Sequence, residues 1–142
     1  MLLQGLKILD FSTMLPGPFA TMMLADLGAE VLHVTKPLEG KQWDKDDYLQ
    51  RSKKSIAVDL KSPEIIASLK ELVKEYDIVV EQFRPGVMTR LGLGYEVLKE
   101  VNPRLIYCSI TGYGQTGPYR DRAGHDINYV SMTGIQGYSG TK

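Results

Sequence analysis

Short apolar runs rich in β-branched residues alternate with segments of helical periodicity along most of this chain. This alternation restricts the fold more than any other feature, because strands separated by helices pair in parallel through right-handed crossovers. We predict strands over residues 7–11, 30–34, 55–60, 77–80 and 104–110. The expected fold is α/β, a Rossmann-like and mostly parallel sheet with helices on both faces.

Helix signals fill the intervals between these strands. Residues 16–18 are expected to form a turn into a helix, in which Pro18 suits the first helical position and Gly28 suits the position just after the end. Four apolar residues between them share one helical face: Phe19, Met22, Met23 and Leu27. Ser62 has the character of an N-cap for the next helix. Shorter helical pieces are expected after Pro85 and over residues 95–101.

The distinctive loops all follow predicted strands. They comprise residues 16–18, 36–37, 83–86 and the glycine-rich stretch from 111 to 118. Parallel sheets bind ligands outside the carboxyl ends of their strands, so these loops are expected to converge on one crevice. Residues 36–54 are polar and irregular, include the only tryptophan, Trp43, and are interpreted as a surface loop.

Length and composition narrow the class of protein. The 142 residues fit one domain, and the 43% hydrophobic content is that of a globular chain. Seventeen basic and 17 acidic residues give a net charge of zero, which argues against nucleic acid or an anionic membrane as a partner. A single Cys108 excludes an internal disulfide, and no apolar run has membrane-spanning length. We therefore expect a cytoplasmic protein.

The chain does not carry a dinucleotide-binding signature. The first strand–helix turn lacks Gly-x-Gly-x-x-Gly, and the second strand is followed by Lys36 in place of an acidic residue for a ribose diol. A nicotinamide cofactor is therefore not expected. Lys36 suits a phosphate or a nucleotide ring, although a solvated lysine at the end of a strand fits the sequence equally well.

Two groups of basic residues have two interpretations each. Arg51, Lys53 and Lys54 form a run whose preferred interpretation is a solvated face. The alternative is a docking site for a multiply charged small molecule, to which Arg84 and Arg90 would add bidentate anion contacts.

The two histidines differ in context. His33 lies inside an apolar strand and is interpreted as a packed, hydrogen-bonded core residue. His125 follows Gly124 and the glycine-rich loop, and it precedes Asp126 and Asn128. A base clustered with polar partners beside a cleft is typical of a proton-transfer site, although a structural role for His125 remains open. No spacing of ligands predicts a metal site.

The chain resembles the N-terminal portion of the class III CoA-transferase (CaiB/BaiF) family, in its α-methylacyl-CoA racemase branch. The resemblance runs through the motifs LPGPF (15–19), LADLGAEV (24–31), KKSIAVDL (53–60), FRPGVM (83–88), LGLG (91–94), NPRLIY (102–107) and GYGQTGP (112–118). GHDINY at 124–129 resembles the racemase-like members, since the transferases usually carry another residue in place of the histidine.

The resemblance implies a function and a set of site residues. His125 would be one acid/base of a two-base proton transfer beside a thioester, and coenzyme A would enter as part of the substrate, with no permanently bound cofactor. The CoA site would be lined by Lys36, Ser55, Ile56, Ala57, Val58, Arg84, Arg90, Gly124, Asp126, Asn128 and Tyr129. The resemblance also implies that the full-length protein forms an interlocked homodimer, as family members do, and that its ligand is an acyl-CoA thioester.

Family members are also much longer, and their second acid/base, an aspartate, follows the histidine segment. We expect residues 1–142 to be the N-terminal CoA-binding domain of a longer chain, inactive by itself. Two alternatives remain: a CoA transferase in which His125 only positions substrate, and a non-catalytic CoA-binding fragment.

Overall fold

The computed structural model describes residues 1–138 and 140, apart from residues 38–46. Its strands are β1 (Lys7–Phe11), β2 (Glu30–Thr35), β3 (Lys54–Ala57), β4 (Ile78–Glu81) and β5 (Ile106–Ser109). Its α-helices are α1 (Pro16–Asp26), α2 (Pro63–Val73), α3 (Val87–Arg90), α4 (Tyr95–Val101) and α5 (Asp126–Met132). Two 3₁₀ turns, η1 (Tyr48–Gln50) and η2 (Ile135–Tyr138), complete the described elements.

The strands form one sheet in the order β3-β2-β1-β4-β5, and every neighbouring pair is parallel. The predicted α/β class and parallel sheet are therefore confirmed. The strand predicted over 55–60 is shorter than expected, because Val58 makes the last backbone bond to β2 at Thr35 and the chain then turns around Asp59. The strand predicted over 104–110 is likewise confined to β5.

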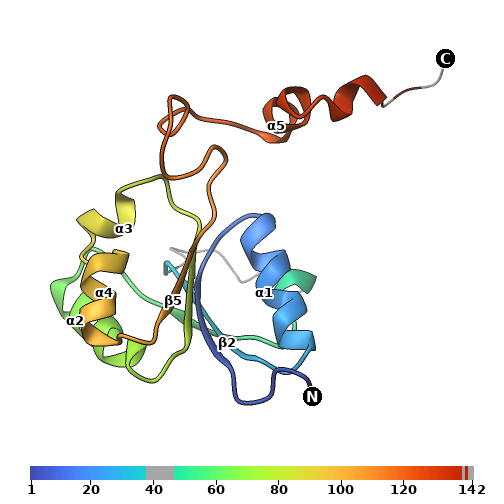
Figure 1. The fold of residues 1–142 in the computed structure, drawn as a ribbon. Helices are drawn as coiled ribbons and strands as arrows, with labels where there is room; N and C mark the ends of the chain where they lie inside the picture. Colours follow the sequence, from blue (N-terminus) through green and yellow to red (C-terminus); the bar gives the residue numbers. More distant parts are fainter. Residues whose placement is uncertain (38–46, 139, 141–142) are drawn as a thin grey trace.

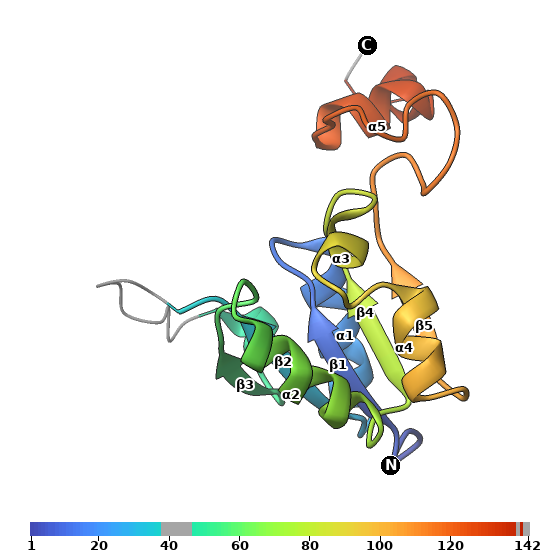
Figure 2. The same ribbon diagram turned by 90° about the vertical axis from the view of Figure 1, so that its left-hand side faces the viewer.

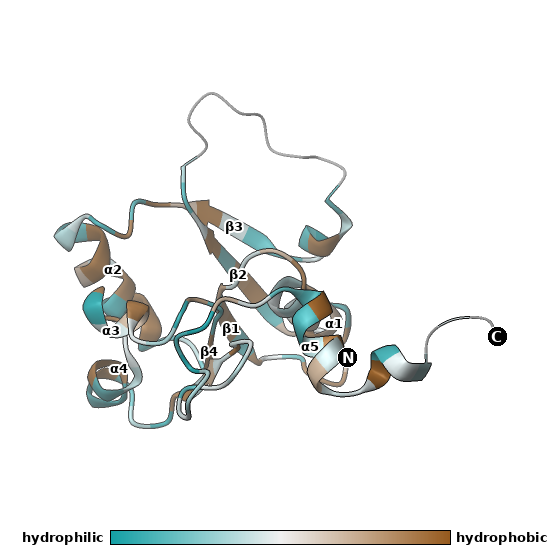
Figure 3. Ribbon diagram, turned by 90° about the horizontal axis from the view of Figure 1, so that it is seen from above, coloured by the Kyte–Doolittle hydropathy of each residue, from teal (hydrophilic) through white to brown (hydrophobic). Residues whose placement is uncertain are grey.

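Helices cover both faces of the sheet, as predicted. Helix α1 lies on one face, and α2 and α4 lie on the other (Figure 1). Each face has its own hydrophobic core, and the larger one, on the α2 and α4 side, includes Leu9, Phe11, Val79 and Leu98. The smaller one includes Ile8, Ala25 and Val31. Viewed from above, the central strands carry the brown colour of hydrophobic residues (Figure 3).

Helix α1 does not bury the face that its periodicity predicts. Phe19, Met23 and Leu27 are exposed, and of the four predicted residues only Met22 is buried. The buried face consists mainly of small or compact residues: Gly17, Pro18, Thr21, Met22 and Ala25. A side chain at Gly17 would overlap Ser12, so the helix approaches β1 too closely for large residues. The close contact between α1 and the sheet, and not the apolar periodicity of the helix, thus determines which of its residues are buried.

The interpretation of residues 36–54 as a surface loop is wrong in part. Asp47 caps η1, since its Oδ1 accepts a 3.0 Å hydrogen bond from the Leu49 N–H, and Leu49 is buried against the domain. Strand β3 also begins inside the predicted loop, at Lys54. Trp43 lies outside the described residues.

A buried polar network joins β1, α1 and the residue before β3. Asp10, with no exposed surface, accepts hydrogen bonds from the Ser12 N–H at 2.9 Å and from the hydroxyls of Ser12 and Thr21 at 2.5 Å. The side chain of Lys53 is 1% exposed, and its ammonium lies 3.4 Å from Asp10 Oδ2 and donates to the Pro18 carbonyl at 2.9 Å and to Thr21 Oγ1 at 2.8 Å. Every proton of the ammonium therefore has an acceptor.

Both interpretations of Lys53 offered by the sequence, a solvated side chain and an anion-docking cation, are therefore wrong. Its neighbours behave as the solvated interpretation predicts: Arg51 pairs with Asp26 at 2.5 Å, and Lys54 pairs with Glu30 at 3.4 Å, all at the surface. Burial lowers the pKa of Lys53, whereas the charge of Asp10 opposes that shift.

His33 is buried beside this network, as predicted. Its Nδ1 lies 3.7 Å from Asp10 Oδ2 and has no hydrogen-bond partner among the described residues. Burial by itself raises the pKa of the Asp10 carboxyl. His33 and the hydrogen bonds from Ser12 and Thr21 lower it by more, so the net effect is a fall from 3.8 to about 2.

The C-terminal segment extends away from the sheet. A loop after β5 leads to α5 and η2, which stand clear of the other helices in two perpendicular views (Figures 1 and 2). No residue of α5 is buried, and Ile127, Met132 and Ile135 are exposed.

Replacement of Lys53 by Met should destabilise the domain strongly, because the Asp10 carboxylate would remain buried without its cation. We expect the free energy of unfolding, measured by urea denaturation, to fall by about 3–5 kcal/mol. Lys54→Met is the matched control, since this side chain is 72% exposed and the loss of its charge should cost less than about 1 kcal/mol. Equal losses for the two variants would contradict the buried ion pair.

Acidification should remove the stabilisation that comes from Asp10. Its folded pKa, about 2, lies below the ordinary 3.8, so the contribution is complete above pH 4 and is lost as the pH falls toward 2. The stability difference between the wild type and Asp10→Asn should shrink by about 2 kcal/mol over this interval. A difference that stays constant from pH 6 to pH 2, measured by denaturation at each pH, would exclude the depressed pKa.

Candidate functional site

The loops that the sequence singles out lie at one edge of the sheet. All five strands run in the same direction, so the loops 36–37, 83–86 and 111–118 all follow the carboxyl ends of strands. Residues 16–18 also follow a strand, but they form the start of α1, so this helix begins two residues earlier than predicted. The glycine-rich loop rises from β5 above this edge and leads to α5 (Figures 1 and 2). These segments therefore share one edge of the sheet, and the cavity at this edge is lined by the loops after β4 and β5.

The first strand–helix turn offers no cradle for a phosphate. Of the first four residues of α1, Pro16 and Pro18 lack an N–H, and the Phe19 N–H donates to the Leu15 carbonyl at 2.9 Å. The remaining N–H, that of Gly17, donates to Gln82 Oε1 at 3.0 Å. The donors that bind pyrophosphate in dinucleotide-binding folds are thus missing or already bonded in this turn.

The predicted ligand residues on β2 and β3 form one end of the edge. Lys36, directly after β2, is exposed, as are Ser55 and Ala57. The side chains of Ile56 and Val58 instead pack against the larger hydrophobic core. Contacts to a ligand from this strand are therefore left to the exposed residues and the backbone.

The loop after β4 brings Arg84 and Arg90 to the same edge. Arg84 lines a cavity of about 200 Å³ together with Gly86, Tyr107, Ser109 and Gln115 from the glycine-rich loop. Gly86, with φ of +82°, begins α3, and a β-carbon there would lie 3.6 Å from Arg90 Nη1. The structure thus places both predicted arginines around one turn.

The wall of this cavity includes a buried carboxylate that the sequence analysis did not consider. Glu81, 5% exposed at the end of β4, accepts a 2.8 Å hydrogen bond from the Phe83 N–H. The hydroxyl of Tyr107 donates to the Leu93 carbonyl, and burial and the charge of Glu81 raise its pKa. Tyr107 therefore stays protonated. An acidic residue that ends an apolar strand was the signal available in the sequence.

His125 stands at the entrance to α5. It is the N-cap residue of the helix, its side chain is exposed, and its backbone N–H donates to Asn128 Oδ1 at 2.9 Å. The neighbouring glycine-rich loop includes Gly114 and Gly117, whose positive φ angles require glycine. The imidazole thus projects from a fixed backbone and remains accessible to a ligand.

An aromatic cluster holds this segment against the glycine-rich loop. Tyr129 of α5 packs at 5.3 Å against Tyr113, which in turn packs at 5.7 Å against Tyr119. A β-carbon on Gly112 would overlap the Tyr129 ring, and one on Gly124 would lie 2.6 Å from its hydroxyl. The two glycines therefore admit the ring, and Tyr129 positions the segment that carries His125.

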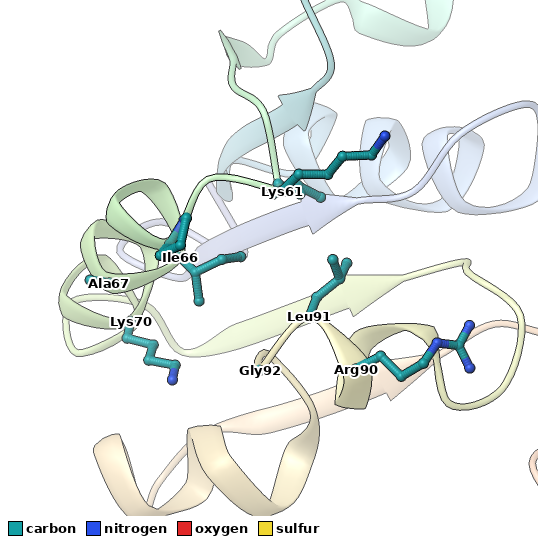
Figure 4. Close-up of a pocket in the computed structure, with 9 residues that line it drawn as sticks. Lys61, Ile66, Ala67, Lys70, Arg90, Leu91 and Gly92 are labelled. Atoms are coloured by element: carbon teal, nitrogen blue, oxygen red, sulfur yellow. The ribbon is translucent and has the colours of Figure 1, made fainter.

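A second, wider groove lies between α2 and α3, with a volume of about 660 Å³ (Figure 4). Its floor is apolar, with Leu60, Ile66 and Leu91, and its basic residues are Lys61, Lys70 and Arg90. The charged ends of these side chains point in different directions, so they do not converge on one anion (Figure 4).

Within the described part of the chain, no hydrogen bond or ion pair joins His125 to Lys36, to Ser55 or to the two predicted arginines. The described residues also contain no cluster of three metal-ligating side chains and no helix long and apolar enough to cross a membrane. The candidate site is therefore an edge lined by separate groups.

The sequence matches a family model described as CoA-transferase family III over residues 3–142. The human succinyl-CoA:glutarate CoA-transferase is 46% identical over 97% of this chain and 34% of its own length. The human alpha-methylacyl-CoA racemase is also 46% identical, over 95% of this chain and 35% of its own length. The chain thus spans about a third of these curated relatives, and identity does not distinguish between their two activities.

The fold is also similar to that of a solved structure. A CAIB/BAIF family protein from Brucella suis superposes with a TM-score of 0.86 and 39% sequence identity, over 96% of this chain and 40% of its own.

Gly124→Ala should loosen the segment that carries His125, because the new β-carbon displaces the Tyr129 ring. A cost of about 1 kcal/mol would speed trypsin cleavage after Arg120 and Arg122 about fivefold. Gly137→Ala, where a β-carbon meets no atom within 4 Å, should leave the cleavage rate unchanged. In a Tyr129→Ala background Gly124→Ala should add nothing, and a further acceleration there would show that the ring is not the cause.

Proposed function

The chain belongs to CoA-transferase family III, and we propose that the protein carrying it moves a proton at the α-carbon of a 2-methylacyl-CoA thioester, as a racemase or epimerase. The observation that carries this proposal is the exposed imidazole of His125, which stands at the start of α5 beside the glycine-rich loop. Histidine is a base whose ordinary pKa lies near neutrality, so it needs no large shift for this task.

The proposed chemistry has two proton transfers. The neutral imidazole takes the α-proton, and the electron pair of the broken C–H bond moves into the thioester carbonyl to give an enolate. Exposed N–H groups of the glycine-rich loop are the proposed donors to the enolate oxygen. A second acid then returns a proton to the opposite face, which inverts the α-carbon. By resemblance this acid is an aspartate that follows the histidine segment.

The CoA moiety is proposed to lie along the carboxyl edge of the sheet. Lys36 and Ser55 stand at one end of this edge, and Arg84 and Arg90 stand beyond β1. Strand spacing separates the ends of β3 and β4 by about 14 Å, a span that suits an extended cofactor. Arg84 and Arg90 suit the phosphates of CoA, because a guanidinium forms paired hydrogen bonds with phosphate oxygens.

A CoA transferase is the second candidate. It is favoured by the human succinyl-CoA:glutarate CoA-transferase, whose identity to this chain equals that of the racemase. In that case His125 would only position the substrate, and the reaction would need a free carboxylic acid as acceptor.

Proton exchange distinguishes these two candidates. The full-length protein, incubated with a 2-methylacyl-CoA in deuterated water without any acceptor acid, should incorporate deuterium at the α-carbon, as measured by mass spectrometry. His125→Asn should slow this exchange about 10²–10⁴-fold, the usual contribution of a positioned base. Binding of CoA to the variant, measured by calorimetry, should persist and serves as its control. An absolute need for an acceptor acid would sink the racemase proposal.

A further inference from the structure

Two guanidinium groups from distant parts of the sequence approach one point beside Gly86. A β-carbon built on Gly86 would lie 3.6 Å from Arg90 Nη1 and 3.9 Å from Arg120 Nη2. Arg90 ends α3, whereas Arg120 lies two residues after the glycine-rich loop, in the segment between β5 and α5. The fold therefore brings together two side chains whose juxtaposition the sequence alone did not indicate.

These cations lack the carboxylates that usually accompany such an arrangement. Among the described residues, no acidic oxygen lies within 4.0 Å of the guanidinium of Arg84 or Arg90. Arg120 approaches only Asp121, at 3.8 Å, and that carboxylate is 82% exposed. Guanidinium groups repel one another unless an anion or water lies between them, so this arrangement suits an anionic ligand.

We propose that Arg120, together with Arg90, binds a phosphate group of coenzyme A. This inference rests on the proposed use of CoA and adds a residue that neither the sequence analysis nor the resemblance assigned. The phosphate would bridge the end of α3 and the segment that leads from the glycine-rich loop to α5. Because Arg120 precedes His125 by five residues on the same segment, phosphate binding would also hold that loop, and thus the imidazole, over the carboxyl edge.

The test compares Arg120→Gln with the wild type in the full-length protein. Loss of one charged contact to phosphate should weaken the affinity for CoA, measured by calorimetry, about tenfold. Arg104→Gln is the matched control: it removes the same charge at an exposed position before β5, at the amino edge of the sheet, and should leave the affinity unchanged.

A second measurement separates phosphate binding from a general distortion of the loop. With a 2-methylacyl-pantetheine, which has no phosphate, Arg120→Gln should turn over at the wild-type kcat/KM, whereas kcat/KM for the acyl-CoA should fall about tenfold. An equal loss with both substrates, or an unchanged affinity for CoA, would overturn the proposal. Absence of α-proton exchange in a protein whose CoA affinity still depends on Arg120 would instead reject the racemase assignment alone.

Discussion

The buried ion pair between Asp10 and Lys53 is the interaction on which the carboxyl edge depends. It joins the end of β1, the first turn of α1 and the residue that precedes β3, three segments that are remote in the sequence. A buried charge is tolerated only when it is paired and hydrogen-bonded, and here each polar atom of the ammonium and the carboxylate has partners. The network thereby fixes where α1 and β3 begin, and these two elements flank the proposed CoA site.

A parallel sheet then determines where chemistry can occur. Because every strand ends at the same edge, Lys36, Arg84 and the glycine-rich loop share one side of the molecule without any local signal that places them together. The first turn of α1 has no free N–H group for an anion, because it contains two prolines and its Gly17 N–H donates to Gln82. The groups that can bind an anion at this edge are therefore Arg84, Arg90 and the glycine-rich loop. The α-proton chemistry proposed for His125 depends on that loop.

Much of this architecture could be predicted from the sequence, and the failures have physical reasons. Strand–helix alternation predicted the sheet, and the Ser62 N-cap and the Gly28 stop placed two helix boundaries correctly. Periodicity failed for α1, because close approach to the chain after β1 at Gly17 leaves no room there for a side chain, and mostly small residues face the sheet. Charge patterning failed for Lys53, whose burial depends on Asp10, 43 residues away. The approach of Arg120 to Arg90 was equally inaccessible, since it arises from the path of the loop after β5.

Hydrogen–deuterium exchange of the full-length protein with and without saturating CoA tests the central claim, that the carboxyl edge is the CoA site, most directly. The account predicts slower amide exchange in three segments, residues 55–58, 84–90 and 111–129, and unchanged exchange at the amino edge around residues 102–105. Protection confined to the groove between α2 and α3 or to the outer face of α1, or protection nowhere in residues 1–142, would contradict it.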